Sequence, residues 1–235
     1  MIKSNRITII SVSDIKIKKT INALIKSTNQ LRPYETIFFT SKSIKLSPIQ
    51  KKYIRKIEID PISSIEEYSK FIIFSLHKFI DTTHVLIVQW DGFITNINKW
   101  DKDFLKYDYI GAPFIPRINE LNYSKDKEGR FYTIGNGGFS LRSKKLLEAA
   151  TKFNLKDNKL LTNYHEDGFF SVLHRNFLES KGFIWAPFNI AKNFSIESPL
   201  SFNDLKELPL GFHGKKMLLI IFLKKLLEKI KSIFL

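Results

Sequence analysis

Two segments of the chain place polar residues where an α/β protein binds ligands. The first, Gln89-Trp90-Asp91-Gly92, follows an apolar run from His84 to Gln89 that is typical of a buried parallel strand. Ligands bind at the carboxyl ends of such strands, and an aspartate there suits a divalent cation bridging a diphosphate, because Mg²⁺ and Mn²⁺ prefer hard oxygen ligands. The alternative is that Asp91 only turns the chain.

The second segment, Ile134 to Ser143, contains three glycines around Asn136. Glycine allows close approach of the backbone, so the N–H groups of Asn136, Gly137 and Gly138 can cradle a phosphate or sugar hydroxyls, and Arg142 can pair with an oxyanion. The segment is not the dinucleotide fingerprint, and it has no P-loop lysine. The alternative is a tight turn into a helix.

Two further segments carry titratable side chains. Glu166 and Asp167 open a predicted helix over 166–180, where they either stabilise the helix dipole or supply a general base for a substrate hydroxyl. Their side chains diverge by about 100° on a helix, so we assign the proton to Asp167 and an orienting or capping role to Glu166. His213, between two glycines, is either structural or completes a metal site.

The elements that must position these residues alternate in type through the first half of the chain. Asp14 is expected to cap one helix, and Ser64 with Glu67 forms a capping-box pattern for another. A literal D-x-D, Asp101 to Asp103, opens a predicted short helix over 100–107, and N-capping accounts for it. The alternation predicts a doubly wound α/β sheet. Strands are expected over 6–13, 36–40, 56–59, 84–89 and 182–185, with a strand end at 109–110.

Composition narrows the classes of protein further. The 235 residues contain no cysteine, which excludes a disulfide scaffold and thiolate chemistry and suits a reducing cytoplasm. The N-terminal residues have no signal-peptide pattern, and no segment reaches the roughly 18–20 apolar residues needed to span a bilayer. The net charge of +15 fits nucleic acid, an anionic membrane or a phosphorylated substrate, or reflects lysine-rich codon usage. No nucleic-acid-binding motif accompanies it, so we do not expect a nucleic-acid partner.

The C-terminal segment, residues 215–235, differs from the rest. Its six lysines and one glutamate give +5, and from residue 222 onward the lysines share one side of a helical wheel while Leu, Ile and Phe share the other. This pattern predicts a helix at an anionic inner leaflet; the alternative is packing on the domain or on a dimer partner. We expect a domain over 1–214 and a basic amphipathic helix over 215–235.

Taken together, the motifs resemble a group of small bacterial glycosyltransferase-like proteins of GT-A type. The motifs are Q-x-D at Gln89–Asp91, D-Y-I-G-A-P at Asp108–Pro113, G-N-G-G-F-S-L-R at Gly135–Arg142, E-D-x-F-F at Glu166–Phe170 and G-F-H-G at Gly211–Gly214. The resemblance covers about residues 6–214. It implies a Rossmann-like mixed central sheet flanked by helices.

The resemblance also implies an activity and a set of roles. Asp91 matches the last aspartate of the GT-A metal motif, where Gln89 replaces the first, and His213 matches a late metal ligand, so Mn²⁺ or Mg²⁺ is the expected cofactor. Asp167 matches the base of inverting enzymes. The implied activity is transfer of a sugar from a nucleotide-sugar donor to a bacterial surface glycan or lipid-linked precursor, peripherally on the inner face of the cell membrane. The alternative is an inactive GT-A-like module that binds a glycan or a partner enzyme.

Overall fold

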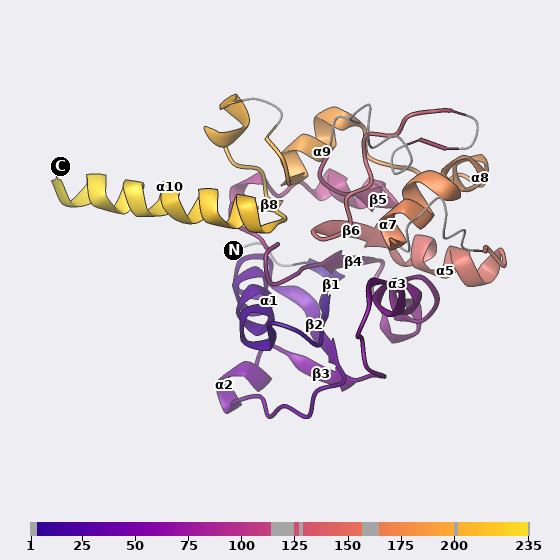
Figure 1. Cartoon of the computed structure of the whole chain (residues 1–235), viewed down its shortest axis with the longest axis horizontal. Coiled ribbons are helices and arrows are strands. Elements are labelled where there is room, and N and C mark those ends of the chain that lie inside the picture. The colour runs from indigo at the N-terminus through magenta and orange to yellow at the C-terminus, as the bar shows by residue number, and fades with distance from the viewer. Residues whose placement is uncertain (1–3, 114–124, 127–128, 157–164, 200–201, 235) are drawn as a thin grey trace.

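The computed structural model describes residues 4–113, 125–126, 129–156, 165–199 and 202–234. Within them, six strands form a mixed sheet in the order β3-β2-β1-β4-β6-β5 (Figure 1). Four strands are parallel: β1 (Ser4–Val12), β2 (Pro33–Thr40), β3 (Arg55–Glu58) and β4 (His84–Ile87). β6 (Ser140–Ser143) runs antiparallel to both β4 and β5 (Tyr109–Ile110). A small parallel sheet pairs β7 (Ser195–Ile196) with β8 (Gly211–Phe212).

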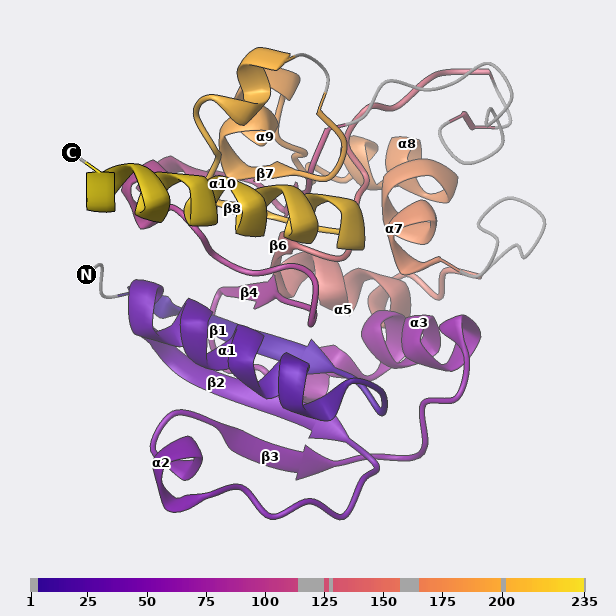
Figure 2. The ribbon, with the colours of Figure 1, turned by 60° about the vertical axis from the view of Figure 1, so that its left-hand side comes forward.

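Helices cover both faces of the large sheet, which confirms the predicted α/β class (Figure 2). α1 (Ile17–Leu31) lies on one face, and α3 (Ile65–Phe74) and α5 (Lys144–Lys152) lie on the other. Neighbouring strand residues alternate between the faces: Ile9 packs in the cluster that contains Leu24 of α1, and Ile10 in the cluster that contains Ile72 of α3. Strands buried on both faces are apolar throughout, which explains the continuous run in β4.

The remaining elements are short, apart from the C-terminal helix. Beside β3 lies α2 (Pro48–Lys51), and α7 (Glu166–Gly168), α8 (Arg175–Ser180) and α9 (Phe188–Phe194) cover the half of the molecule that contains β5 and β6 (Figure 1). The chain ends in α10 (Lys215–Phe234). Short 3₁₀ helices span Leu76–Phe79, Ile97–Lys99, Lys102–Lys106 and Phe202–Leu205.

Several element ends follow the sequence signals. Ser64 and Glu67 form the predicted capping box of α3. Asp101 accepts a hydrogen bond from the Asp103 N–H, so capping does account for the literal D-x-D. The Ser143 hydroxyl caps α5 by accepting from the Leu146 N–H.

Three expectations about elements are wrong. Asp14 does not cap α1, because Lys16 holds the N-cap position and makes no side-chain cap. The predicted helix over 166–180 is interrupted by a π-helical turn at Phe169–Leu173, where two consecutive phenylalanine rings are fully buried. Consecutive burial departs from the single apolar face of a surface α-helix. Residues 182–185 form an isolated bridge between Trp185 and Tyr109 rather than a strand.

α10 packs on the domain through its first half, as far as Lys224, whose Nζ donates to the carbonyls of Leu205 and Lys206. Met217 and Ile221 are buried in a cluster with Ala23 of α1 and Phe212 of β8, and the helix then projects from the body of the molecule (Figure 1). Among the residues that the structure describes, no helix combines the length and apolarity needed to cross a membrane. The helical prediction is confirmed over 215–234, and the division into two units at residue 214 stays a prediction.

Candidate functional site

A cleft of about 630 Å³ opens at the carboxyl edge of the parallel strands. Its walls come from the segments that follow β1, β3 and β4, and from the loop before β6. That loop reaches the same edge because β6 runs antiparallel to β4. The volume lies in the range of small-molecule sites, about 300–1,000 Å³. The lining residues are 11–15, 62–65, Tyr68, Gln89, Trp90, 136–138, 165–167, Glu197 and His213.

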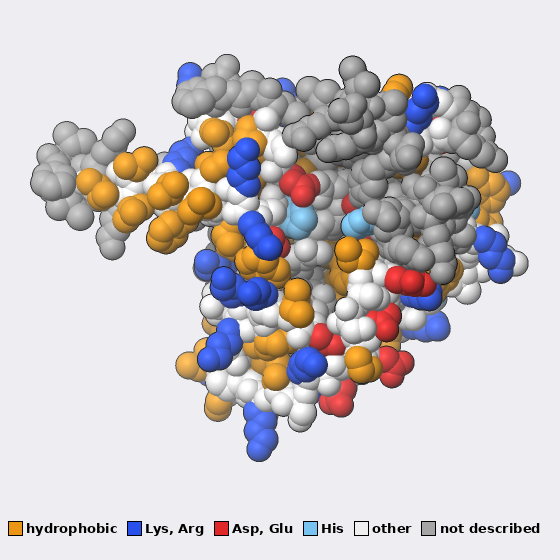
Figure 3. Space-filling view, in the orientation of Figure 1, with side chains coloured by type: hydrophobic (Ala, Val, Ile, Leu, Met, Phe, Trp, Pro, Cys, Tyr) orange, Lys and Arg blue, Asp and Glu red, His pale blue; other side chains and the backbone are white. Residues whose placement is uncertain are grey.

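The cleft collects most of the side chains singled out from the sequence. Gln89, Asn136, Gly137, Gly138, Glu166, Asp167 and His213 line it, whereas Asp91 and Arg142 are buried next to it. In the space-filling view, histidine and acidic side chains gather at the centre of this face, close to the start of α10 (Figure 3). Four of the five motifs therefore meet in one region, although they are spread over more than a hundred residues.

Glycines bring the motifs together by allowing close approach. A Cβ on Gly111 would overlap the backbone of Asn136, so D-Y-I-G-A-P packs directly on the glycine loop. A Cβ on Gly138 would overlap the imidazole of His213, and one on Gly137 would overlap a carboxylate oxygen of Glu166. The requirement for glycine in these motifs is therefore steric.

The two acidic residues of the E-D pair point to different partners. Glu166 Oε1 accepts from Arg142 Nη2 at 2.7 Å, and both side chains are buried. Asp167 Oδ2 instead accepts from the Gly137 N–H at 3.0 Å, and its Oδ1 from the Gly168 N–H at 2.8 Å. The two carboxylates therefore have different surroundings, and the division of roles between them stays a prediction.

Arg142 has a position that the sequence did not suggest. Its side chain is fully buried, donates from Nε to Ser140 Oγ, and stacks over Tyr109 at 5.0 Å from the ring centre. Burial lowers the pKa of Arg142, but Tyr109 and Glu166 outweigh it and raise that pKa above its ordinary value, so the guanidinium stays charged. We therefore revise its expected role from contact with a ligand to holding Glu166 beneath the glycine loop.

His213 stands at the centre of a polar group at the rim of the cleft. Its Nδ1 lies 3.0 Å from Glu197 Oε1, and its Nε2 lies 3.2 Å from Gln89 Oε1 and 3.9 Å from Asp91 Oδ1. Burial lowers the pKa of His213, but the hydrogen bond and charge of Glu197, together with Asp91, outweigh it and raise that pKa. The predicted proximity of Asp91 and His213 is confirmed.

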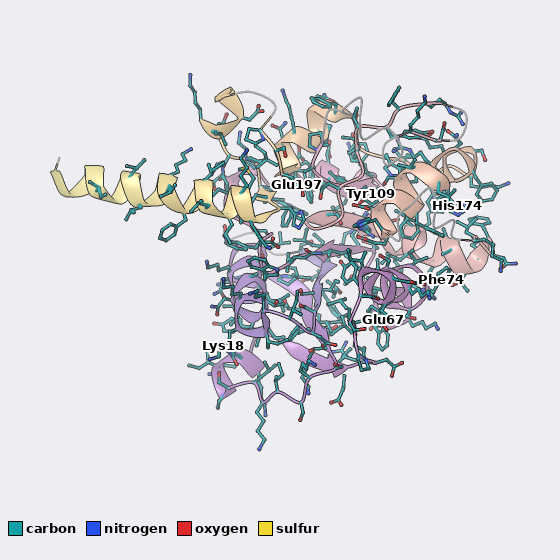
Figure 4. All side chains as sticks on the ribbon, viewed as in Figure 1. Lys18, Glu67, Phe74, Tyr109, His174 and Glu197 are labelled. Carbon is teal, nitrogen blue, oxygen red and sulfur yellow. The ribbon has the colours of Figure 1, made fainter. Side chains whose placement is uncertain are left out.

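The local topology explains why Glu197 meets His213. β7 pairs with β8 in the register Ile196 to Phe212, so the next residue of each strand comes side by side. Glu197 also lies beside Gly214, the residue that precedes α10, as the labelled side chain in Figure 4 indicates. The carbonyl of Asp91 accepts from the Gly214 N–H at 2.9 Å, which ties the strand-end segment to the same place.

These atoms fit a divalent cation with two protein ligands. Asp91 Oδ1 is buried and has no hydrogen-bond partner among the described residues, and two metal–ligand bonds of about 2.1 Å can span the 3.9 Å to His213 Nε2. With a proton on Nδ1 for Glu197, Nε2 turns its lone pair toward two oxygen atoms, an arrangement that a cation stabilises. Within the described residues, no group of three or more His, Cys, Asp or Glu side chains is arranged to hold a metal.

Two features of the cleft were missed in the sequence. The Asp14 carboxylate accepts four hydrogen bonds, from the Thr40 hydroxyl, from the N–H and hydroxyl of Ser41, and from the Ile62 N–H. Burial raises the pKa of Asp14, but these bonds outweigh it, and the pKa is lowered. Asp14 thereby ties the loops after β1, β2 and β3 into one wall.

The second missed feature is the surroundings of Trp90. Lys19 Nζ from α1 and Lys215 Nζ from α10 lie 5.2 and 5.8 Å from the centre of the indole ring, which lines the cleft. Trp90 could be singled out from the sequence because it stands beside Asp91 at the end of a strand. No spacing in the sequence predicts that Lys19 of α1 and Lys215 of α10 lie close to its ring. The cleft therefore has positive charge at one rim.

The fold and cleft define an α/β protein with a polar ligand site at the carboxyl edge of its sheet. Residues 51–213 match the model of a family described as a protein of unknown function (DUF5672), and the chain belongs to this family. No curated protein sequence matches the chain. Among solved structures, it is similar to a glycosyltransferase involved in the glycosylation of the major capsid of PBCV-1, with 16% identity, a TM-score of 0.49, and coverage of 88% of this chain and 92% of that one.

Proposed function

We propose that this protein transfers a sugar from a nucleotide-sugar donor to a hydroxyl group of a glycan or lipid-linked acceptor, with inversion at the anomeric carbon. One observation carries the proposal. A carboxylate held by backbone N–H groups, Asp167, lines the same cleft as the polar group around His213 and the backbone of Gly137 and Gly138. A base and a diphosphate site within one cleft are what this reaction requires.

In the proposed reaction, Asp167 takes the proton of the acceptor hydroxyl. The hydroxyl oxygen then attacks the anomeric carbon, the bond from that carbon to the phosphate oxygen breaks, and the nucleoside diphosphate leaves with the electron pair. Lys19 and Lys215 supply positive charge at the rim where the diphosphate is proposed to lie. A divalent cation on Asp91 and His213 would act there as a Lewis acid for the leaving group.

The second candidate is an inactive GT-A-like module that binds a glycan or a partner enzyme. It is favoured by Gln89, which stands where the GT-A motif has its first aspartate and which hydrogen-bonds His213. Binding without transfer would support this candidate. We also propose that the acceptor is met at the inner face of the cell membrane, because the basic helix α10 begins at the rim of the cleft.

The experiment is a thermal-shift screen of nucleotide sugars with and without Mn²⁺, followed by product analysis for the hits. A ligand at a hundred times its Kd adds about 2.7 kcal/mol, which for a chain of this size raises Tm by roughly 5–10 °C. The free sugars and the nucleoside monophosphates serve as controls. If no nucleotide sugar raised Tm with or without the cation, the transferase proposal would fail.

A further inference from the structure

An apolar stripe on α10 faces away from the protein's own domain. Six of its side chains are 41–62% exposed, and at 100° per residue they fall within one sector of the helix. Met217 and Ile221, which pack on the domain, lie on the opposite side. No described part of the domain covers the stripe, which consists of Leu219, Phe222, Leu223, Leu226, Leu227 and Ile230.

Lysines lie next to this stripe on a different part of the chain. α1 contacts the first turns of α10 through Ala23, and its solvent side carries Lys18, Lys19 and Lys26, with Lys16 just before it. The sequence of α1 contains no acidic residue. Figure 3 shows lysines gathered below the orange side chains of α10, and Figure 4 labels Lys18 at the outer edge of the domain.

We infer that the α10 stripe and the α1 lysines, here named the α1–α10 surface, bind an anionic lipid bilayer. An interfacial helix needs an exposed apolar face with basic residues beside it, and this surface provides both. The stripe from Leu219 to Ile230 is about 16 Å long, which suits a helix lying in the interface plane rather than crossing it.

Charge selects lipid over a second copy of the chain. The segment 215–235 has six lysines and one glutamate, so two copies paired along α10 would bring +5 against +5. An anionic leaflet instead attracts each lysine near it by about 1 kcal/mol, or roughly five-fold in affinity. The α1 lysines add to the same attraction from a segment about two hundred residues away in the sequence.

The position of the surface bears on the proposed reaction. α10 begins two residues after His213, and Lys215 reaches Trp90 in the wall of the cleft. When the α1–α10 surface lies on a bilayer, this rim of the cleft lies at the bilayer too. A lipid-anchored acceptor would therefore reach the cleft across this rim. This consequence rests on the proposed function, whereas lipid binding itself does not.

The test measures co-sedimentation of the full chain with vesicles of phosphatidylcholine alone or mixed with phosphatidylglycerol. Two triple variants separate the contributions: Leu223→Gln, Leu226→Gln and Leu227→Gln for the stripe, and Lys16→Gln, Lys18→Gln and Lys26→Gln for α1. Glutamine keeps a high helix propensity. The matched control is Lys152→Gln, Lys156→Gln and Lys181→Gln, three exposed lysines in and near α5 and α8, on the opposite side of the molecule from α10 (Figure 1).

We expect binding to the mixed vesicles only, a loss of at least ten-fold for each surface variant, and wild-type binding for the control. Equal binding to both vesicle types, or no effect of the α1 lysines, would overturn the inference. So would a concentration-dependent dimer that leaves vesicles unbound, since the stripe would then pair with a second copy. Hydrolysis of the nucleotide-sugar donor, assayed without vesicles, tests the proposed function separately.

Discussion

Gly137 and Gly138 are neighbours in the sequence, but replacing each by alanine should affect different properties: ligand affinity at Gly138 and stability at Gly137. At Gly138, a Cβ would overlap the imidazole of His213, whose side chain is partly exposed and can retreat. Restoring an ordinary contact of about 3.5 Å moves the ring by roughly an ångström. Metal ligands tolerate about 0.2 Å, so affinity for Mn²⁺ and for a nucleoside diphosphate should fall by about 10–100-fold.

The fold should tolerate Gly138→Ala. The backbone at Gly138 does not have a positive φ, so alanine fits the conformation and stability should change by less than about 1 kcal/mol. At Gly137, the Cβ would overlap Glu166 Oε1 and lie 2.9 Å from Arg142 Nη2. Both groups are buried and paired, so neither can retreat, and Gly137→Ala should lower the free energy of unfolding by about 2–4 kcal/mol.

Chemical denaturation measures the stability of both variants, and isothermal titration calorimetry measures their affinity for Mn²⁺ and nucleoside diphosphate. Gly182→Ala is the control, because that glycine has φ +78° and open space around it. Backbone strain should lower the stability of this variant and leave its affinity for both ligands unchanged. Wild-type affinity in Gly138→Ala would refute the role of His213. Wild-type stability in Gly137→Ala would refute the rigidity of the buried pair.

Three further predictions concern single side chains. Asp91→Asn should weaken the binding of Mn²⁺ and of a nucleoside diphosphate together. If calorimetry showed that only one of these affinities falls, the cation and the diphosphate would bind at separate sites. Arg142→Met should cost about 3–5 kcal/mol in urea denaturation because it leaves Glu166 charged and buried, and adding Glu166→Gln should recover most of the loss. The pKa of Asp14 is lowered, so its stabilisation is present above its unfolded pKa and is lost as pH falls. The stability gap between wild type and Asp14→Asn should therefore shrink as the pH falls below about 4, and a constant gap would contradict this.

Local patterns predicted the parts of the fold that depend on neighbours in the sequence. The apolar run from His84 and the capping box at Ser64 lead to β4 and α3, since burial and capping act within a few residues. The predicted cap at Asp14 was wrong because the partners of its carboxylate are distant in the sequence. Its carboxylate finds Thr40, Ser41 and Ile62, up to 48 residues away, and four such bonds outweigh one cap.

The candidate site was predictable as a set of motifs but not as a set of contacts. Gln89, the glycine loop, the E-D pair and His213 could be singled out by residue type. Glu197 could not, because it meets His213 only through the register of two-residue strands. Arg142 was expected at a ligand because it follows the glycine loop in the sequence, yet its place on β6 points it into the core beside Glu166.

The most direct test of the proposed function is the rate of sugar transfer by Asp167→Asn with the donor found in the thermal-shift screen and its true acceptor. Asparagine keeps the size of the side chain and one of its two acceptor oxygens, which can still accept from the Gly137 N–H of the cleft, so the donor should bind with near wild-type affinity. Loss of the general base should cut transfer by about 10²–10⁴-fold. Transfer at the wild-type rate by this variant would contradict the proposed mechanism.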